Sequence, residues 1–363
     1  MTTERALSEE TVYDPRPVLK VDGERDERLD GLLLSVSVRI EEGGLTTAEL
    51  RVSEVASDGD AGADWAFQDA RVLDLGVRIQ VSMGDAADPI EVFDGRVSGL
   101  ELELGEQTPP ELVVYAEDAL FKARLHRRTK VWTDTTLADV VRDVAQQLSL
   151  TPDIDGLDAP VHTEVQLDES DLAFLRRLLD RHDADLQVTG DRLTAQTRAN
   201  RAEEEVVLVR GSQLRSVRIL ADLAHQATHV STAGFDVDRG EHVHHTASGR
   251  QPGPGRGRTG ATTLDDTRGE RRAHIGHVAV RSSDEARAIA EAAFDQRARR
   301  FVTAEGTAAG NPRIRLGTRL TLQGCGPRFD NTYDVLAVTH RYDLEAGYQT
   351  DFRAACAFFG EGR

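Results

Sequence analysis

Apolar and polar side chains alternate along the first third of the chain, which predicts β-strands with one buried face. The alternation runs through residues 34–40 and resumes at 47–52, after the turn Glu41-Glu-Gly-Gly44. Short antiparallel strands in series predict a β-barrel or sandwich over residues 17–116. Residues 1–16 are polar and predicted to form a flexible arm. Further strands are expected at 78–83, 92–103 and 111–116, with an acidic loop at 57–65.

The period changes to that of amphipathic helices in residues 117–204. Thr136-Leu-Ala-Asp139 forms a capping box before a helix, and Asp168-Glu-Ser-Asp171 caps a second one. A hairpin is expected around Thr189-Gly190-Asp191. The segment is therefore predicted to be a small α/β unit.

Strands return in residues 205–363, so a second β-rich unit is predicted there. A helix at 283–300 is expected to begin at the cap Ser282, and residues 248–262 are so rich in Gly and Pro that an exposed, mobile loop is predicted. The order of units suggests a duplicated barrel, although no repeat of residues is evident. Strands are expected at 206–209, 215–219, 228–235, 301–304, 318–323, 333–340 and 348–358.

The net charge of −19 disfavours stable nucleic-acid binding, because a phosphate backbone needs a basic surface. Simple solubility explains this charge equally well. Cys325 and Cys356 form no Cys-x-x-Cys pair, so a zinc ribbon is not expected and both are predicted to be buried thiols. The sequence shows no signal peptide and no apolar run of membrane-spanning length. Cytoplasmic synthesis without membrane insertion is therefore expected.

Three motifs resemble reactive or ligand-binding sites. Gly255-Arg-Gly257-Arg-Thr-Gly260 fits a dinucleotide fingerprint, but it lies in a Pro-rich run with no helix predicted after it. His242-Val-His244-His245 could ligate a metal, although exposed strand histidines are the favoured interpretation. Asp180–Asp185 is interpreted as a polar helix end. Since no catalytic motif is present, no enzymatic activity, cofactor or metal is predicted.

The residues from Tyr333 to Phe352 predict a β-hairpin. The first strand runs through His340-Arg-Tyr-Asp, a turn follows at Leu344-Glu-Ala-Gly347, and the return strand continues through Tyr348 and Thr350. This order resembles the last hairpin of baseplate hub proteins of contractile injection machines. That family comprises the phage late control D proteins, the hub part of VgrG proteins and gp27-like proteins.

Further motifs extend the resemblance over residues 18–358. Phe93-Asp-Gly95 with Pro110–Asp118 is similar to the end of the family's first barrel, and Asp168–Leu178 to its "E-S-D-x-x-F-L-x-R-L" helix. Residues 304–317 resemble its "G-x-P-x-L-x-x-G" segment, whereas the loop 248–260 is outside the pattern and is predicted to be a surface insertion. The positions of this chain that carry the family motifs are Gly95, Asp118, Asp171, Phe174, Leu175, Gly306, Pro312, Gly317, Tyr333, His340, Gly347, Tyr348 and Thr350.

The resemblance implies a β-rich α+β fold in which two tail-tube-like antiparallel β-barrel units flank the small α/β unit. It also implies a homotrimer whose six barrels form a pseudo-sixfold ring joining a hexameric tail tube to a trimeric spike, among other baseplate proteins of a virion tail or injection particle. The acidic charge could then line the passage, a hypothesis that excess acids on the outer wall would contradict. His340 would be a strand-end side chain of the closing hairpin.

Two functions from other classes are weighed against the hub. A tail-associated cell-wall hydrolase would need a catalytic domain, for which no span is left. A carbohydrate-binding adhesin usually needs exposed aromatic residues, and aromatic residues are only 5% of this chain. The sequence does not distinguish a phage tail from a tailocin or a secretion system.

Overall fold

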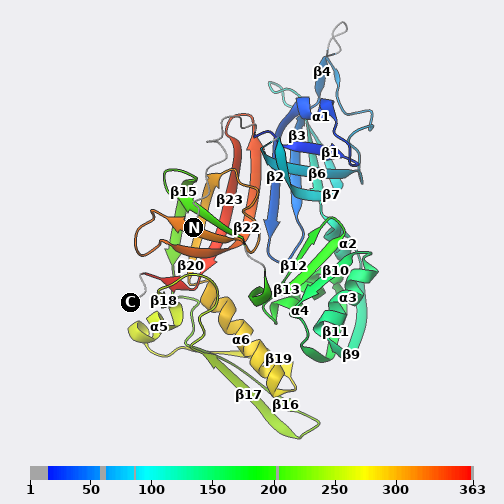
Figure 1. Ribbon diagram of the computed structural model, residues 1–363. Helices are drawn as coiled ribbons and strands as arrows, with labels where there is room; N and C mark the ends of the chain where they lie inside the picture. The colour runs from blue at the N-terminus through cyan, green and yellow to red at the C-terminus, as the bar shows by residue number, and fades with distance from the viewer. Residues whose placement is uncertain (1–14, 58–62, 86, 202–203, 361–363) are drawn as a thin grey trace.

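A computed structural model describes residues 15–57, 63–85, 87–201 and 204–360 (Figure 1). Strands hold 51% of the residues and helices 19%, which confirms the predicted β-rich α+β fold. Three separate hydrophobic cores form, one in each β-rich unit and one in the α/β unit between them. The predicted arm falls mostly on residues 1–14, which lie outside the described residues.

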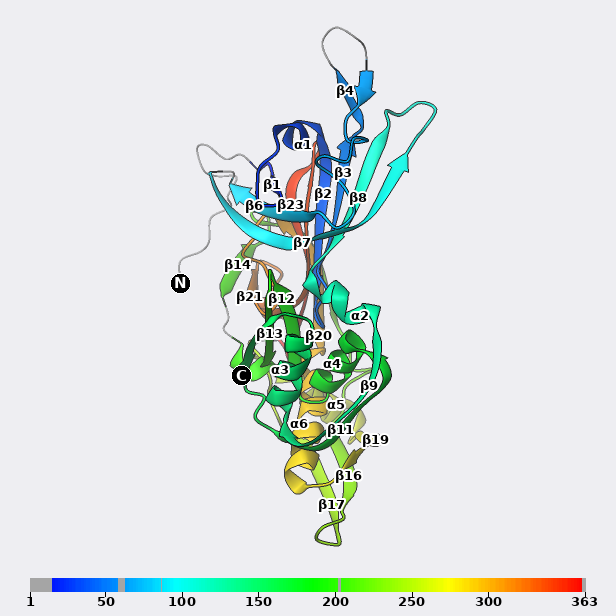
Figure 2. The same cartoon turned by 90° about the vertical axis from the view of Figure 1, so that its right-hand side faces the viewer.

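The first unit is built from strands in which buried and exposed side chains alternate, as the sequence pattern predicts. The predicted loop at 57–65 is wrong at both ends, because Ser57 and residues 63–65 belong to two short paired strands, β4 and β5, which project from the unit (Figure 2). The rest of that prediction lies outside the described residues. Its elements are β1 Val18–Val21, α1 Glu27–Leu32, β2 Leu33–Glu41, β3 Thr47–Ser53, β4 Val55–Ser57, β5 Ala63–Trp65, β6 Arg78–Asp85, β7 Asp88–Glu103 and β8 Glu111–Glu117.

The middle unit has the two predicted helices and both predicted caps. The Thr136 hydroxyl accepts a hydrogen bond from the Asp139 N–H at 3.1 Å, and Ser170 accepts one from Ala173 N–H at 3.2 Å. The sequence interpretation missed the paired strands β9 and β11. The elements are η2 Ala119–Phe121, α2 Lys122–Leu125, β9 Arg127–Thr136, α3 Leu137–Gln147, β10 Thr151–Asp155, β11 Pro160–Ser170, α4 Asp171–Asp180, β12 Ala184–Thr189, β13 Arg192–Thr197 and η3 Arg198–Asn200.

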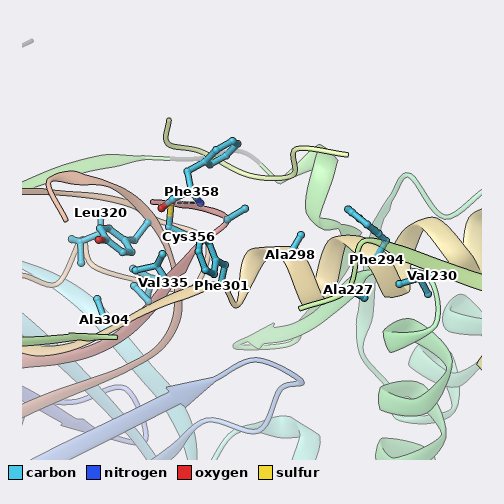
Figure 3. Packing of buried hydrophobic residues seen from close by; sticks show 14 of the residues in the cluster. Ala227, Val230, Phe294, Ala298, Phe301, Ala304, Leu320, Val335, Cys356 and Phe358 are labelled. Atoms are coloured by element: carbon cyan, nitrogen blue, oxygen red, sulfur yellow. Dashed lines mark hydrogen bonds between the residues drawn. The ribbon is translucent and has the colours of Figure 1, made fainter. Parts of the chain in front are cut away.

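In the last unit the helix α6 links the strand core to a smaller three-stranded sheet. Phe294 of α6 lies near Val230 of that sheet, Ala298 follows along the helix, and Phe301 continues the core into the larger sheet (Figure 3). The elements are β14 Glu205–Val209, β15 Leu214–Ala221, β16 His229–Asp236, β17 Glu241–Ser248, β18 Arg258–Thr259, α5 Gly260–Arg268, β19 Arg272–Val280, α6 Ser283–Arg299, β20 Val302–Ala309, β21 Arg319–Gln323, β22 Asn331–Asp343, β23 Gly347–Cys356 and β24 Phe358–Phe359.

One prediction about the Gly/Pro-rich loop is wrong, because a helix, α5, does follow the Gly-x-Gly motif. The loop is mostly exposed, as predicted, but hydrogen bonds anchor it to the sheet. The Arg256 N–H donates to the Asn331 side chain at 3.1 Å, and the Asn331 amide donates back to the Arg256 carbonyl at 2.9 Å. Gly255 lies so close to Asn331 and Cys356 that a Cβ there would clash with both. Glycine therefore lets the backbone follow the sheet closely, which composition alone does not show.

The two β-rich units share one topology. The first has the strand order β1-β6-β7-β8-β3-β2, and the last has β14-β21-β22-β23-β20-β15, in the same chain order. All five equivalent neighbours pair, and the direction differs only for β14 and β21, which run parallel. β-bulges recur at Leu33/Ser35 and Leu214/Ser216, and again at Val97/Gly99 and Val335/Ala337. The duplication thus includes the irregularities of the strands.

Aligning the two registers reveals a repeat of residues that the linear sequence hides. Leu33-x-Ser35-Val36 of β2 corresponds to Leu214-x-Ser216-Val217 of β15. Thr47-Ala-Glu49 of β3 corresponds to Thr303-Ala-Glu305 of β20. Matching residues are few because a strand requires only the alternation, which many side chains satisfy.

The two units are joined into one twelve-stranded sheet. Strand β2 of the first unit pairs antiparallel with β22 of the last, from Ser35↔Asp343 to Glu41↔Ala337. Figure 1 shows β2 beside β22, with the middle unit below the first. Hydrogen bonds across this pair fix the orientation of the two units.

Candidate functional site: the junction of the three units

The closing hairpin places His340 inside the junction, so the expectation of a strand-end side chain is wrong. His340 is fully buried, opposite Val38 of the first unit. Its Nδ1 lies 2.9 Å from the Tyr348 hydroxyl and 3.3 Å from the Thr350 hydroxyl. Burial, aided by the charge of Arg315 and opposed by the Ile314 carbonyl, lowers the pKa of His340 to about 3. The ring is therefore neutral and serves packing.

The segment after β20 carries further motif residues from the last unit onto the first. The Asn311 N–H donates to the Thr350 hydroxyl at 2.9 Å, which fixes the start of this segment beside His340. Pro312 is buried, and a Cβ at Gly84 of β6 would lie 3.2 Å from its ring. Arg315 donates to the Glu91 carbonyl of β7 at 2.9 Å. This segment is a second bridge between the two β-rich units.

The turn between β2 and β3 binds the middle unit. The Gly43 N–H donates to Asp185 Oδ1 at 3.0 Å. Arg176 of α4 donates to the carbonyls of Gly43 and Gly44 at 2.6 and 2.9 Å. A Cβ at Gly44 would meet the Leu120 side chain at 2.5 Å. Backbone and side chains of the first two units are thus interlocked at this turn.

A chain of ion pairs connects all three units. Arg198 of the middle unit pairs with Glu42 of the first unit and, at 3.2 Å, with Asp183. Asp183 also pairs with Arg299 at the end of α6, in the last unit. Burial raises the pKa of Asp183, although Arg299 and Arg198 oppose this shift. These side chains are mostly buried, so solvent screens their pairing less than at a surface.

A second ion pair, Asp185–Arg201, is almost fully buried at 2.7 Å. The motif residue Gly317 lies against it, and a Cβ there would come 2.0 Å from Arg201 Cδ. Gly317 also has a φ of +78°, which side-chain-bearing residues rarely adopt. The segment Asp180–Asp185, interpreted from sequence as a plain helix end, therefore supplies two central carboxylates of the junction. Their partners are too distant in sequence for any local signal to reveal them.

Asp118 and Gly95 lie at the boundary of the first and middle units. Asp118 accepts hydrogen bonds from the Thr46 and Leu120 N–H groups at 2.6 and 2.9 Å. Burial raises the pKa of Asp118 to about 6, although both bonds favour the carboxylate. A Cβ at Gly95 would lie 2.3 Å from the Glu117 carbonyl, so glycine permits this close approach of β7 to β8. All three units line a cavity of about 80 Å³ here.

The middle-unit motif residues form its core and the first turns of α4. Phe174 stacks on Trp132 of β9 with ring centroids 4.9 Å apart, and Leu175 is fully buried beside it. Buried Asp171 accepts from the Gln166 amide at 2.9 Å and pairs with Arg128 at 3.0 Å. These contacts hold the ribbon of β9 and β11 on the helices.

The remaining motif residues shape the last unit. A Cβ at Gly306 would lie 2.4 Å from the Ser216 carbonyl and close to the Phe352 ring. Buried Tyr333 donates to the Phe329 carbonyl at 2.7 Å, and Gly347 has a φ of +68° at the turn between β22 and β23. None of these positions resembles a reactive group, since each supports packing or a turn.

The candidate histidine cluster holds no metal-like arrangement. Among the described residues, no group of three or more His, Cys, Asp or Glu side chains is placed to hold an ion. His242 and His244 are exposed on β17, and His245 lies on the opposite face near Glu291. In the same described part of the chain, no helix has the length and apolar character needed to cross a membrane.

Comparisons with known proteins identify relatives with a similar sequence or fold. The probable baseplate hub protein of Escherichia phage 186 is 32% identical over 123 residues, a stretch that is 31% of this chain and 32% of the phage protein. The match thus spans about a third of that relative's length. The 43 kDa tail protein of prophage MuSo2 from Shewanella oneidensis has a TM-score of 0.69 at 14% identity, covering 94% of this chain and 98% of its own.

A type VI secretion component of E. coli, described as similar in structure to the T4 bacteriophage tail proteins gp27 and gp5, has a TM-score of 0.55. Its identity is 12%, over 95% of this chain and 79% of that one. These similar proteins are tail, baseplate and secretion-system components rather than enzymes. The predicted resemblance to tail hub proteins is thereby confirmed, and the fold is theirs. A family model described as Alg8 N-terminal domain matches residues 18–343, and the chain belongs to that family.

Proposed function

We propose that the protein is a structural hub of a contractile phage tail or of a related injection machine. Three copies would form a ring that joins the hexameric tail tube on one side to a trimeric spike on the other. The supporting observation is the duplicated topology, because three chains with two equivalent units present six similar faces to a tube. The duplicated units differ in their insertions, which leaves threefold symmetry for the spike.

The junction supports a mechanical role within this proposal. A hub has to transmit force between tube and spike, and independent units would rotate about their linkers. Here the shared sheet, the bridge at Pro312 and the ion pairs through Asp183 fix all three units together. Other baseplate proteins would bind the outside, in the virion tail or injection particle. Whether acidic residues line the passage stays a prediction.

The test is assembly of the purified chain, alone and with the tube and spike proteins of the same particle. We expect a trimer by light scattering and a ring by electron microscopy, with the spike on one face and the tube on the other. Some hubs could require the spike to trimerise, so the mixture decides the result. A chain that stays monomeric with both partners present would contradict the proposal.

A further inference from the structure

Two strands of the twelve-stranded sheet, β15 and β7, have an open edge in the part of the chain that the structure describes. They are the equivalents of β2 and β22, which pair with each other in the internal seam, where the two β-rich units join. Strand β15 pairs only with β20, so within the described residues its other edge is open. Strand β7 uses residues up to Arg96 for β6 and residues from Arg96 for β8. The edge of Gly99–Glu103 that faces away from β8 therefore has no partner strand in the described part of the chain. Open edges of this kind readily pair with another strand.

The internal seam shows what these edges can bind. In the duplicated topology β15 is equivalent to β2, and β7 is equivalent to β22. The seam pairs β2 with the second half of β22, beyond the bulge at Val335/Ala337. The equivalent half of β7, beyond the bulge at Val97/Gly99, is the half that lacks a partner.

We propose that β15 of one copy pairs antiparallel with residues 99–104 of β7 and its extension in the next copy, repeating the β2–β22 seam between molecules. Transferring the internal register sets Ala221 opposite Leu100, Ile219 opposite Leu102, and Val217 opposite Leu104. The inference rests on the proposed hub function, in which the chain forms a ring. It specifies which strands join the subunits.

Burial of the equivalent residues supports this pairing. Val338, His340 and Tyr342 of β22 are at most 7% exposed and lie opposite Ile40, Val38 and Val36 of β2. Tyr342 belongs to the core of the first unit, and Ile40 packs against the core that contains Val338. Their equivalents Leu100, Leu102 and Leu104 are 37%, 41% and 64% exposed. An alternating row of exposed leucines on one strand face indicates a missing neighbour.

Charge also fits the predicted register. Arg218 of β15 falls opposite Glu103, as Ser37 falls opposite Arg341 in the internal seam. Within one chain Glu103 pairs with Arg51 at 3.0 Å, so the incoming arginine would extend an existing ion-pair network. Because the chain carries a net charge of −19, most other surfaces of two copies would repel each other. Opposite charges at facing positions therefore favour this pairing.

A groove is present where the tip of the incoming strand would lie. It is lined by residues 214–217 and 219 of β15 together with Arg210, Cys325 and Phe329. The corresponding groove beside β2 is lined by residues 30–34 and, from the last unit, by Tyr342 of β22 and by Leu344 of the turn after it. Since Tyr342 is equivalent to Leu104, the groove at β15 is expected to receive Leu104 of the next copy.

The first experiment places a charge in the proposed interface. Leu102→Lys should weaken self-association about a hundredfold, because the lysine would be buried without a partner. It should leave the circular dichroism and Tm of the separate chain nearly unchanged, since Leu102 is already 41% exposed. Leu125→Lys is the matched control, because Leu125 is 52% exposed in the middle unit and away from both edges. Equal assembly by Leu102→Lys and wild type would overturn the inference.

The second experiment tests the register by cross-linking in a Cys325→Ser background. Leu102→Cys with Ile219→Cys should form intermolecular disulfides on oxidation, and Leu102→Cys with Val217→Cys, two residues out of register, should not. No cross-linking, or equal cross-linking by both pairs, would overturn the inference. If the wild type forms a trimer but the Leu102–Ile219 cross-link does not form, the pairing of β15 with β7 is wrong and the trimeric hub is still supported. Cross-linked assemblies of another subunit number would support the strands and contradict the trimeric hub.

Discussion

His340 makes the junction sensitive to acid, and the size of this effect can be worked out. Its pKa is lowered to about 3 by burial, whereas an unfolded histidine titrates near 6.5. Between these values the unfolded chain binds a proton that the folded chain excludes. Stability is therefore present above pH 6.5 and is lost as pH falls toward 3. From pH 7 to pH 5 the free energy of unfolding should fall by about 2 kcal/mol on account of His340.

The assay is urea unfolding followed by circular dichroism at pH 7 and pH 5, on wild type and His340→Asn. An asparagine oxygen can take the place of Nδ1 as acceptor for the Tyr348 hydroxyl, but it does not titrate. The variant should be less stable at pH 7, and its loss between pH 7 and pH 5 should be smaller than that of wild type by about 2 kcal/mol. Burial also lowers the pKa of His182, to about 4, so some acid sensitivity will remain in the variant.

Exposed His126 supplies the control, and His126→Asn should keep the pH dependence of wild type. If His340→Asn loses as much stability between pH 7 and pH 5 as wild type does, the reasoning is refuted. Such a result would mean that the folded protein accommodates a protonated His340.

Three further substitutions test the packing. Arg201→Met should destabilise the junction by about 3–5 kcal/mol because it leaves the Asp185 carboxylate buried and unpaired, and Arg201→Met with Asp185→Leu should recover most of this loss in urea unfolding. Phe174→Ala should cost the middle unit about 3–5 kcal/mol and change the fluorescence of Trp132, on which the ring stacks; an unchanged spectrum would contradict the stacking. Gly347→Val should lower the free energy of unfolding by about 1–3 kcal/mol because Gly347 has a φ of +68°. No atom lies within 4 Å of a Cβ added there, so the cost comes from the backbone conformation, and Gly347→Asn should cost less in thermal unfolding.

Local patterns predicted the elements that depend on neighbouring residues. The caps at Thr136, Ser170 and Ser282 each accept the expected backbone hydrogen bond, because a cap involves residues only three positions apart. Strand alternation likewise placed most strands of both β-rich units. The ribbon of β9 and β11 was missed, since its buried side depends on Trp132 meeting Phe174 from a later helix.

The junction was not predictable in the same way. Glu42 and Arg198 are 156 positions apart, and Asp183 and Arg299 are 116 positions apart. Neither member of each pair carries a local signal that distinguishes it from a solvated surface charge. The family resemblance marked Gly317 and His340 as notable, but their reasons, contact with Arg201 and burial against the first unit, appear only in three dimensions.

The sequence by itself determined most strands of the two β-rich units, the helices capped at Thr136, Ser170 and Ser282 and, through its motifs, the tail-hub resemblance. These features depend on periodicity and on short-range turns and caps, which involve only residues close together in the sequence. The tertiary structure alone decided that the two β-rich units repeat one topology, share a sheet at β2 and β22, and leave β7 and β15 with open edges. Strand pairing has this character because its hydrogen bonds are made by backbone groups, which are the same in every residue. Which strand meets which is therefore settled by packing across the whole chain.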